Sequence, residues 1–598
     1  MKTNLPILRG GARCPQRAFK TFVRSQTSVL RTSRSTSILC LLSSVLCLLL
    51  SAPAAHAQWQ TVNYTLRGGW NSIYLHGEAS HATIETLLAD RPEVISIWRW
   101  NPNPSQIQFS SSSLIPTNGT PEWTTWTRNG TANTLTALTG QAAYLVECMG
   151  AVTDTYQLSL VQRALPPRST WVRNGANLLG FPSRLSGSYP TMANFFATFP
   201  VATATNSKIY KYAGGPLGAG NPINIFSTAG EPLDRTQAYW FEAAVVGDFY
   251  APIEVSPSNL DGLSYGRNGS LITVRVRNRT AAAVTLTAAP LTSAAAPAGQ
   301  DQVTGPVPLT YRTFNTSTNA YEFRAVDAGN PVAVVVAPQS SVELSFGVDR
   351  ALITGEANTL YASLLRVTDG GNLMDVYLPV SARVTSLSGL WIGDVTVSDV
   401  QAKVPGVTGT ATGRTFPLRV ILHVDDLGIA RLLSQVFIGK LAASPYNVGL
   451  ATLESGLKAT DLATARRFSA AHLPPETVIA GAGSVALGQT LVRTINLDFK
   501  APTNPFVHTY HPDHDNRSAR FDAALTVGVE SPTVSRACSF NFTTSPPAGS
   551  GSSPQGWGST VIGGTYSETI TGIHKTPTTV TGLFELRRVS ELGTLTTN

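Results

Sequence analysis

The chain has 598 residues, more than one hydrophobic core usually organises, so the sequence predicts several domains. Charged residues make up only 13% of it, and Ser, Thr, Ala, Gly and Pro are abundant, which is typical of β-modules joined by turns rather than of a helical cytosolic enzyme. The formal net charge is +8, but residues 1–57 carry eight basic residues and no acidic ones, so the remaining chain is neutral and nucleic-acid binding is not favoured.

The N-terminal segment has the three parts of an export signal. A basic stretch, residues 1–37, precedes an apolar run of fifteen residues from Ile38 to Ala52, and an A-x-A cleavage site follows at Ala55 to Ala57. The apolar run is too short for a comfortable membrane span. We therefore expect residues 1–57 to be a signal peptide and the mature protein to have no membrane span. Its predicted location is secreted, periplasmic or on the cell surface.

Cysteine usage excludes a disulfide framework. Of the five cysteines, three belong to the predicted signal peptide, and only Cys148 and Cys538 remain, in what we expect to be different modules. Cys538 alternates with Phe540 and Phe542, and this pattern predicts a cysteine that is buried in a strand.

Three phrases occur twice in the same order, which indicates an internal duplication. The pairs are Arg67–Leu75 with Arg173–Phe181, Ile97–Trp100 with Ile209–Tyr212, and Ala143–Glu147 with Ala238–Glu242. We predict two tandem α+β repeats, residues 58–165 and residues 166–255, which share a larger core when they pack as a pair.

Each repeat is predicted to contain the same elements. The first has strands at 70–75, 94–100 and 142–147, a helix at 82–89 capped by Ser80, and a long loop or irregular hairpin at 101–135. The second has strands at 176–181, 208–212 and 238–242 and a helix at 191–198.

Residues 256–386 change to short alternating segments. Strands are predicted at 271–278, 283–287, 332–336, 342–346 and 374–380. Short strands separated by turn residues predict an antiparallel β-sandwich of immunoglobulin type, and the absence of a Cys…Trp…Cys core excludes an antibody-like disulfide.

Residues 387–598 are predicted to form a larger β-barrel or β-sandwich. Its strands are expected at 390–397, 416–425, 429–438, 523–529, 538–543, 566–570 and 579–589, with one short helix at 460–471. In the strand 416–425, Val420 and Leu422 face one way while His423 and Asp425 face the other. The whole chain is thus predicted to be mainly β and multi-domain.

The histidine-rich stretch from His508 to Asn516 is a candidate metal site. Imidazole with carboxylate suits Zn, Mn, Fe or Ni, and carboxylate with amide oxygen suits Ca. The candidate ligands of a divalent metal are His508, His511, Asp513, His514, Asp515, His423 and Asp425. The alternative is a solvated loop, because Pro, Asp and Asn favour turns and no zinc spacing such as HExxH or CxxC is present.

Tryptophans give a second candidate site. Trp98 and Trp100 lie on one face of a strand, with tyrosines at the matching positions of the second repeat, so we expect them in the core. Trp123 and Trp126 lie in the polar loop of the first repeat, where exposed rings would stack on a glycan. Burial in the core is the alternative for this second pair.

No local motif indicates catalysis. The chain has no GxSxG elbow, no Walker A loop and no GxGxxG turn between a strand and a helix. A pair of carboxylates for glycoside hydrolysis needs no local spacing, and nothing in the sequence identifies one.

Several phrases resemble parts of secreted modular bacterial proteins. Gly69–Ile73 and Ala238–Glu242 are similar to a G-W-N-[LI] and A-Y-W repeat of such proteins. Leu390–Asp394, Leu418–Asp425 and Tyr510–Asn516 are similar to C-terminal modules of exported proteins of this kind. The resemblance implies export and modularity, and it implies no activity.

The sequence therefore favours an extracellular or cell-surface protein that acts by binding or scaffolding, with glycans as one ligand class. One alternative is a metal-dependent enzyme or metal-binding module centred on the stretch from His508 to Asn516. The other is a β-barrel in the C-terminal module that carries a small ligand.

Overall fold

The computed structural model describes most of the chain after the predicted signal peptide. It covers residues 58–595 except 102–115, 118, 173–174, 186, 205–207, 219, 244–246, 403–409, 434, 442–447, 452–464, 473–478, 498–532 and 573–576. The signal peptide prediction thus lies outside the described residues. Within the described part no helix is both long and apolar enough to cross a membrane.

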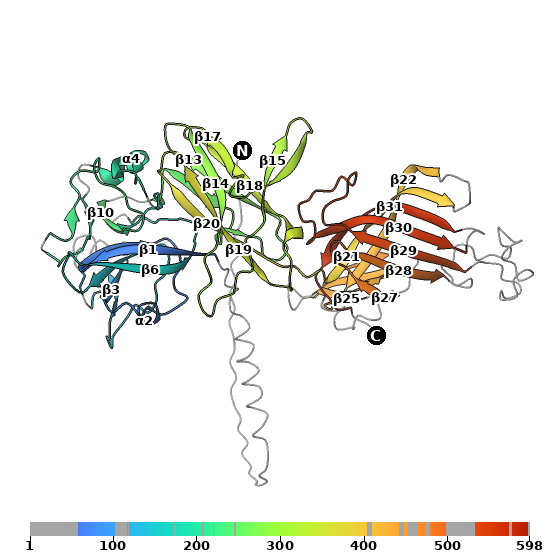
Figure 1. The fold of residues 1–598 in the computed structure, drawn as a ribbon, viewed down its shortest axis with the longest axis horizontal. Helices are drawn as coiled ribbons and strands as arrows, with labels where there is room; N and C mark the ends of the chain where they lie inside the picture. Colours follow the sequence, from blue (N-terminus) through green and yellow to red (C-terminus); the bar gives the residue numbers. More distant parts are fainter. Residues whose placement is uncertain are drawn as a thin grey trace, which may run out of the picture. The chain divides into compact units, whose positions relative to one another are not determined.

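The chain is mainly β and multi-domain, as predicted (Figure 1). In the first repeat, a sheet has the order β2 (Gly69–Leu75), β5 (Ala142–Cys148), β3 (Val94–Trp100), β4 (Trp123–Thr127). In the second, a sheet has the order β7 (Gly175–Leu179), β10 (Tyr239–Ala243), β8 (Lys208–Lys211), β9 (Ile223–Asn224). The two sheets share one strand order, as an internal duplication predicts.

Each repeat has a short helix between the first two strands of its four-stranded sheet, β2 and β3 in the first repeat and β7 and β8 in the second. In the first, α2 (Ile84–Leu87) begins after Thr83, whose hydroxyl accepts a hydrogen bond from the Thr86 amide at 3.3 Å. The prediction that Ser80 caps this helix is wrong, because Thr83 is the residue in N-cap geometry. In the second, Thr191 caps α4 (Met192–Phe195), which continues into the 3₁₀ turn η1 (Phe196–Thr198).

Both faces of the repeat sheets are buried, so successive side chains enter two different cores. On β5, Tyr144 and Val146 pack with the helix of the first repeat, whereas Ala143 and Leu145 enter a core shared with the second repeat. The members of this shared core, which we call the inter-repeat core, are Tyr74, Trp98, Trp100, Trp123, Ala143, Leu145, Ala176, Leu178, Tyr212, Ala238 and Trp240. The prediction that the repeats share a core is confirmed.

Hydrogen bonds to backbone carbonyls also join the two repeats. The Trp70 amide donates to the Gly215 carbonyl at 3.0 Å, and the Ser72 hydroxyl donates to the Ala238 carbonyl at 2.7 Å. Gly69 has φ +91°, and a Cβ there would lie 2.3 Å from the Gly215 carbonyl oxygen. A glycine is therefore required where the two backbones approach each other.

His76 is buried at this junction. Its Nε2 lies 3.0 Å from the Arg235 carbonyl oxygen, and only 8% of the residue is exposed. Burial lowers the pKa of His76 well below its ordinary value, and the nearby positive charge of Arg235 lowers it further. The imidazole is therefore neutral in the folded protein at neutral pH.

We expect acid to destabilise the protein through His76. Because the folded-state pKa of His76 is depressed, the unfolded chain binds the proton more tightly than the folded protein does. The neutral imidazole therefore stabilises the folded protein above about pH 6.5, and this stabilisation is lost as the pH falls. Below about pH 6.5, this one group lowers the free energy of unfolding by up to about 1.4 kcal/mol for each pH unit. Chemical unfolding between pH 7 and pH 5 should show a shallower loss in His76→Gln than in the wild type, and equal slopes would contradict the assignment.

Strands β1 (Trp59–Arg67) and β6 (Thr155–Arg163) form a separate antiparallel pair.

The following module is a sandwich of two five-stranded sheets. One has the order β11 (Ile253–Pro257), β13 (Leu271–Asn278), β18 (Ser341–Val348), β15 (Leu309–Asn315), β16 (Ala320–Ala325). The other has the order β12 (Leu263–Ser264), β20 (Asp375–Arg383), β19 (Leu360–Asp369), β14 (Val284–Thr292), β17 (Val332–Val336). The predicted sandwich strands are all present.

The described C-terminal strands form an eight-stranded curled sheet and a three-stranded sheet. The large sheet has the order β27 (Ile479–Ser484), β23 (Ile429–Leu432), β22 (Thr410–Val424), β21 (Gly389–Ala402), β31 (Thr578–Ser590), β30 (Val561–Thr571), β29 (Val534–Phe542), β28 (Thr490–Leu497). The small one has the order β25 (Val448–Ala451), β24 (Gln435–Leu441), β26 (Ala465–His472).

The helix predicted at 460–471 is wrong where the structure describes it, because Ala465–His472 is strand β26. It pairs with β24 from Gln435 to Leu441. The alanines of this segment favour a helix when it is considered alone, but pairing with a neighbouring strand overrides that local preference. The strand predicted at 523–529 lies outside the described residues.

Candidate functional site

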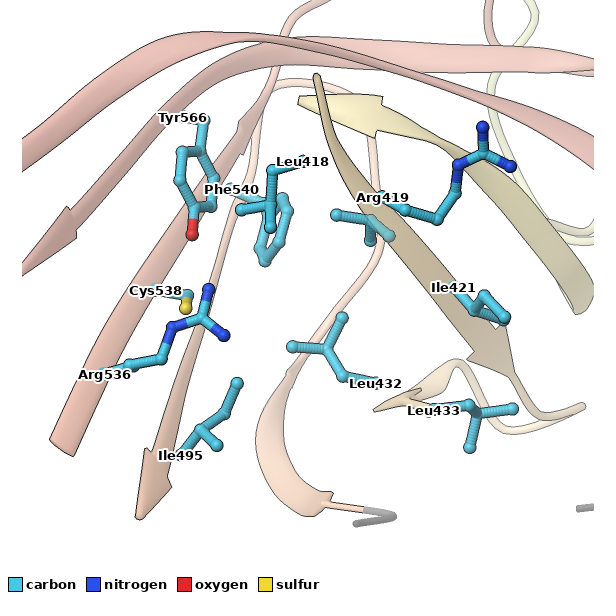
Figure 2. A pocket seen from close by; sticks show the side chains of 11 residues that line it. Leu418, Arg419, Ile421, Leu432, Leu433, Ile495, Arg536, Cys538, Phe540 and Tyr566 are labelled. Carbon is cyan, nitrogen blue, oxygen red and sulfur yellow. The ribbon is translucent and has the colours of Figure 1, made fainter. Parts of the chain in front are cut away.

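The inner face of the C-terminal curled sheet is filled by side chains. Its buried cluster includes Trp391, Val395, Leu422, Phe540, Phe542, Tyr566, Phe584 and Leu586. A cavity of about 30 Å³ remains between β22, β29 and β30, with Phe540 and Cys538 on its wall (Figure 2). A space of this size holds at most about two water molecules. The described interior of the curled sheet therefore has no room for a ligand enclosed within it, which counts against the ligand-carrier alternative.

One side of this cavity is polar. The Arg536 guanidinium donates to Glu568 Oε1 at 2.5 Å, and the Tyr566 hydroxyl donates to Glu568 Oε2 at 2.8 Å. Burial raises the pKa of the Tyr566 hydroxyl, and the neighbouring Cys538 and Glu568 raise it further, so this group remains a hydrogen-bond donor at neutral pH. The arrangement is a satisfied buried ion pair, which fixes the packing of two strands.

A larger groove lies on the opposite, outer face of the same sheet. It has a volume of about 580 Å³, within the range of small-molecule sites. Its floor is formed by β21, β22 and β31, and a Gly/Ser segment at 549–552 lines its side. The lining residues are Ile392, Gly393, Asp394, Thr396, Ser398, Arg419, Gly549, Ser550, Ser552, Leu583, Phe584, Glu585 and Arg587. We call it the outer groove.

A row of charged side chains crosses the floor of the outer groove. Asp394 on β21 lies directly opposite Arg419 on β22 and Glu585 on β31, and directly opposed side chains on one face have Cβ atoms about 4.5–5.5 Å apart. Arg419 Nε donates to Asp394 Oδ1 at 2.6 Å, and Arg587 donates to Glu585 Oε1 at 2.8 Å. The Ser552 hydroxyl donates to the Glu585 carboxylate, which ties the 549–552 segment to the floor.

The charged row presents hydrogen-bonding groups to the outer groove. Its side chains are partly exposed, 38% for Asp394 and 28% for Glu585, so their remaining hydrogen-bonding positions face the groove. The two carboxylates and two guanidiniums also cancel in charge, which favours a neutral polar ligand over an ion.

The predicted metal residues divide into two groups. His508, His511, Asp513, His514 and Asp515 lie outside the described residues, so their role as ligands stays a prediction. Among the residues that the structure does describe, no group of three or more His, Cys, Asp or Glu is placed to hold a metal ion.

His423 and Asp425 lie at the end of β22 and make local contacts. His423 is fully buried, with its Nε2 3.1 Å from the Leu592 carbonyl oxygen, and burial lowers its pKa. Asp425 Oδ1 accepts from the amides of Leu427 at 3.0 Å and Ile429 at 2.8 Å, which closes the turn between β22 and β23. Both residues thus have structural roles in the described fold.

The predicted glycan-stacking rings, Trp123 and Trp126, are buried, so the expectation of exposure is wrong. Trp123 is 6% exposed in the inter-repeat core, and Trp126 is 2% exposed with its Nε1 donating to Glu85 at 2.7 Å. The segment that contains them is strand β4, which pairs with β3 and turns both rings inward. The prediction that Trp98 and Trp100 belong to the core is confirmed.

The sequence reasoning missed the outer groove. Alternation along β21 places Asp394 on the outer face, because the next residue, Val395, is buried on the inner face, and this alternation can be seen in the sequence. The neighbour that completes the row, Glu585, comes from a distant part of the chain, and no local pattern indicates that pairing.

Comparisons with known proteins do not identify a relative. No protein-family model matches the chain, and no curated protein matches it. Solved structures share only local similarity at low identity. The CupB2 chaperone of Pseudomonas aeruginosa is 11% identical, with 33% of this chain and all of that chain covered and a TM-score of 0.14. The chaperone DraB of E. coli is 11% identical, with 30% and 89% covered and a TM-score of 0.14.

Proposed function

We propose that this protein is a secreted or cell-surface binding protein and that the outer groove binds a neutral polyhydroxylated ligand, a glycan. The observation that carries the proposal is the charge-balanced row of Arg419, Asp394, Glu585 and Arg587 on the floor of a groove of about 580 Å³. The predicted signal peptide supports an extracellular location, and the mature chain has no excess charge to attract nucleic acid.

The chemistry of the lining explains the ligand class. Carboxylate and guanidinium groups form pairs of hydrogen bonds with adjacent hydroxyl groups, which fixes the orientation of a sugar ring. Ser550, Ser552, Thr396 and Ser398 add hydroxyl groups around the row, and Leu583 adds an apolar surface. A ligand site commonly combines such placed polar groups with apolar walls.

A glycan array with residues 58–598 tests the proposal, followed by calorimetric titration of the best ligand. We expect Asp394→Asn to weaken binding at least about tenfold, because it removes one charged acceptor and leaves the Arg419 guanidinium without a charged partner. Asp301→Asn is the matched control, since Asp301 forms a partly exposed pair with Arg383 in the sandwich. Wild-type affinity in Asp394→Asn, or no bound glycan at all, would contradict the proposal.

The same titration examines the metal-binding alternative. The metal content of the purified chain shows whether the stretch from His508 to Asn516 holds a divalent metal. Glycan titration after treatment with a chelator shows whether glycan binding needs that metal. If the wild type contains stoichiometric metal and a His511→Ala, His514→Ala variant contains none, the metal site is established. The titration of Asp394→Asn then decides separately whether the outer groove binds the glycan.

A further inference from the structure

The hairpin of β15 and β16 extends beyond the sheet that carries it. β15 pairs with β16 from Thr310 to Asn315 but with β18 only from Leu309 to Tyr311. β16 is the last strand of its sheet, and no other described strand pairs with its outer edge. Figure 1 shows this hairpin projecting from the sandwich near its label β15.

The register determines which backbone groups of β16 point outward. The Val326 amide donates to the Leu309 carbonyl, so residues 326 and 309 form a hydrogen-bonded pair, and alternate residues along β16 do the same. Tyr321 and Phe323 fall between these pairs. Their amide and carbonyl groups are therefore directed to the open edge, where they are free to pair with another strand.

The hairpin also exposes aromatic rings. Phe314 is 50% exposed and Tyr321 is 60% exposed, and their ring centroids lie 5.2 Å apart. The Arg312 guanidinium lies over the Tyr321 ring at 4.4 Å. An edge strand with open backbone groups and exposed rings has the features of an association surface rather than of a protected edge.

We propose that β16 pairs with β16 of a second copy of this chain, in an antiparallel arrangement centred on Phe323. In this register Phe323 lies opposite its own copy, and Tyr321 lies opposite Ala325, so the outward backbone groups form hydrogen-bonded pairs. The Ala325 carbonyl accepts from Asn330 Nδ2 at 3.3 Å, and its second lone pair accepts from the partner strand. Glu322 of each chain lies opposite Arg324 of the other. Opposite charges placed directly across two strands stabilise the pairing, and the two-fold axis produces the contact twice.

The charges of β16 explain why a second copy is the occupant. The sequence of the strand, Ala320-Tyr-Glu-Phe-Arg-Ala325, is complementary to itself when reversed about Phe323. Its charged side chains are held in place, since Arg324 donates to the Pro331 carbonyl at 3.1 Å and Glu322 accepts from Asn315 at 2.6 Å. An edge protected against its own copy would instead carry one sign of charge.

Analytical ultracentrifugation of residues 58–598 over a concentration series tests the proposal. We expect a monomer–dimer equilibrium, and we expect Glu322→Arg or Arg324→Glu alone to weaken the dimer at least about tenfold by placing like charges opposite each other. The double variant restores the opposite pairs and should dimerise like the wild type. Glu356→Arg, in an exposed loop of the sandwich, is the control for charge reversal away from the edge.

Tyr321→Pro provides a second test that does not depend on charge. It removes an outward amide but no hydrogen bond to β15, so circular dichroism should remain that of the wild type while the dimer is lost. A wild-type chain that stays monomeric throughout the series would overturn the proposal. So would a dimer that is indifferent to both single charge reversals and to Tyr321→Pro, because its interface would lie elsewhere.

Discussion

Trp240→Ala should lower the free energy of unfolding by about 3–5 kcal/mol, among the largest effects expected for one substitution in this chain. Trp240 is 1% exposed in the inter-repeat core. Its ring lies edge-to-face against Trp100 of the other repeat, with centroids 4.9 Å apart, and its Nε1 donates to the Tyr212 hydroxyl at 3.3 Å. Truncation leaves a cavity between two rigid sheets that cannot close over it. Chemical unfolding followed by circular dichroism measures the loss.

Trp70→Ala is the matched control. Trp70 lies at the rim of the same core, where it is only half-buried, and Ala176 occupies the equivalent place in the second repeat. We expect a loss of about 1 kcal/mol or less, because little apolar surface returns to water. Equal losses for Trp240→Ala and Trp70→Ala would show that the two repeats are not stabilised by their shared core.

Glu568→Ala should have a comparable cost of about 3–5 kcal/mol, because it breaks a buried ion pair and removes a carboxylate that two side chains donate to. The Glu568 side chain is 2% exposed and that of Arg536 is 17% exposed. The substitution also removes the acceptor of the Tyr566 hydroxyl. The same unfolding measurement applies, made at neutral pH.

Two further variants separate the charge effect from the loss of packing. Glu568→Leu combined with Arg536→Met should recover part of the stability, since an apolar pair of similar volume leaves no charge buried, while the Tyr566 hydroxyl still lacks its acceptor. Asp301→Ala, which breaks the partly exposed pair with Arg383, should cost less than about 1 kcal/mol. A Glu568→Ala loss as small as that of Asp301→Ala would contradict the assignment of a strongly stabilising buried ion pair to Glu568 and Arg536.

The sequence by itself determined the repeat architecture and the faces of the strands. The duplicated phrases around Trp70 and Ala176 predict two modules, and the structure has two sheets of one strand order. Alternation in β22 predicts that Val420 and Leu422 share a face, and both enter the inner core. These features are local, because side-chain direction in a strand repeats every two residues.

Only the tertiary structure decided which faces meet and which stay open. Trp123 and Trp126 stand in a polar stretch that resembles a loop, yet pairing with β3 buries both rings. The strand β26 was hidden by a composition that favours a helix, because the hydrogen bonds that decide its conformation come from β24.

The outer groove depends on the same kind of distant pairing. Asp394 and Glu585 become neighbours because β21 and β31 lie side by side in the curled sheet. Each residue alone is an ordinary surface carboxylate of an alternating strand. A binding site arises when strand order brings their outward faces together, and strand order is set by how the whole sheet closes over its core rather than by any local pattern.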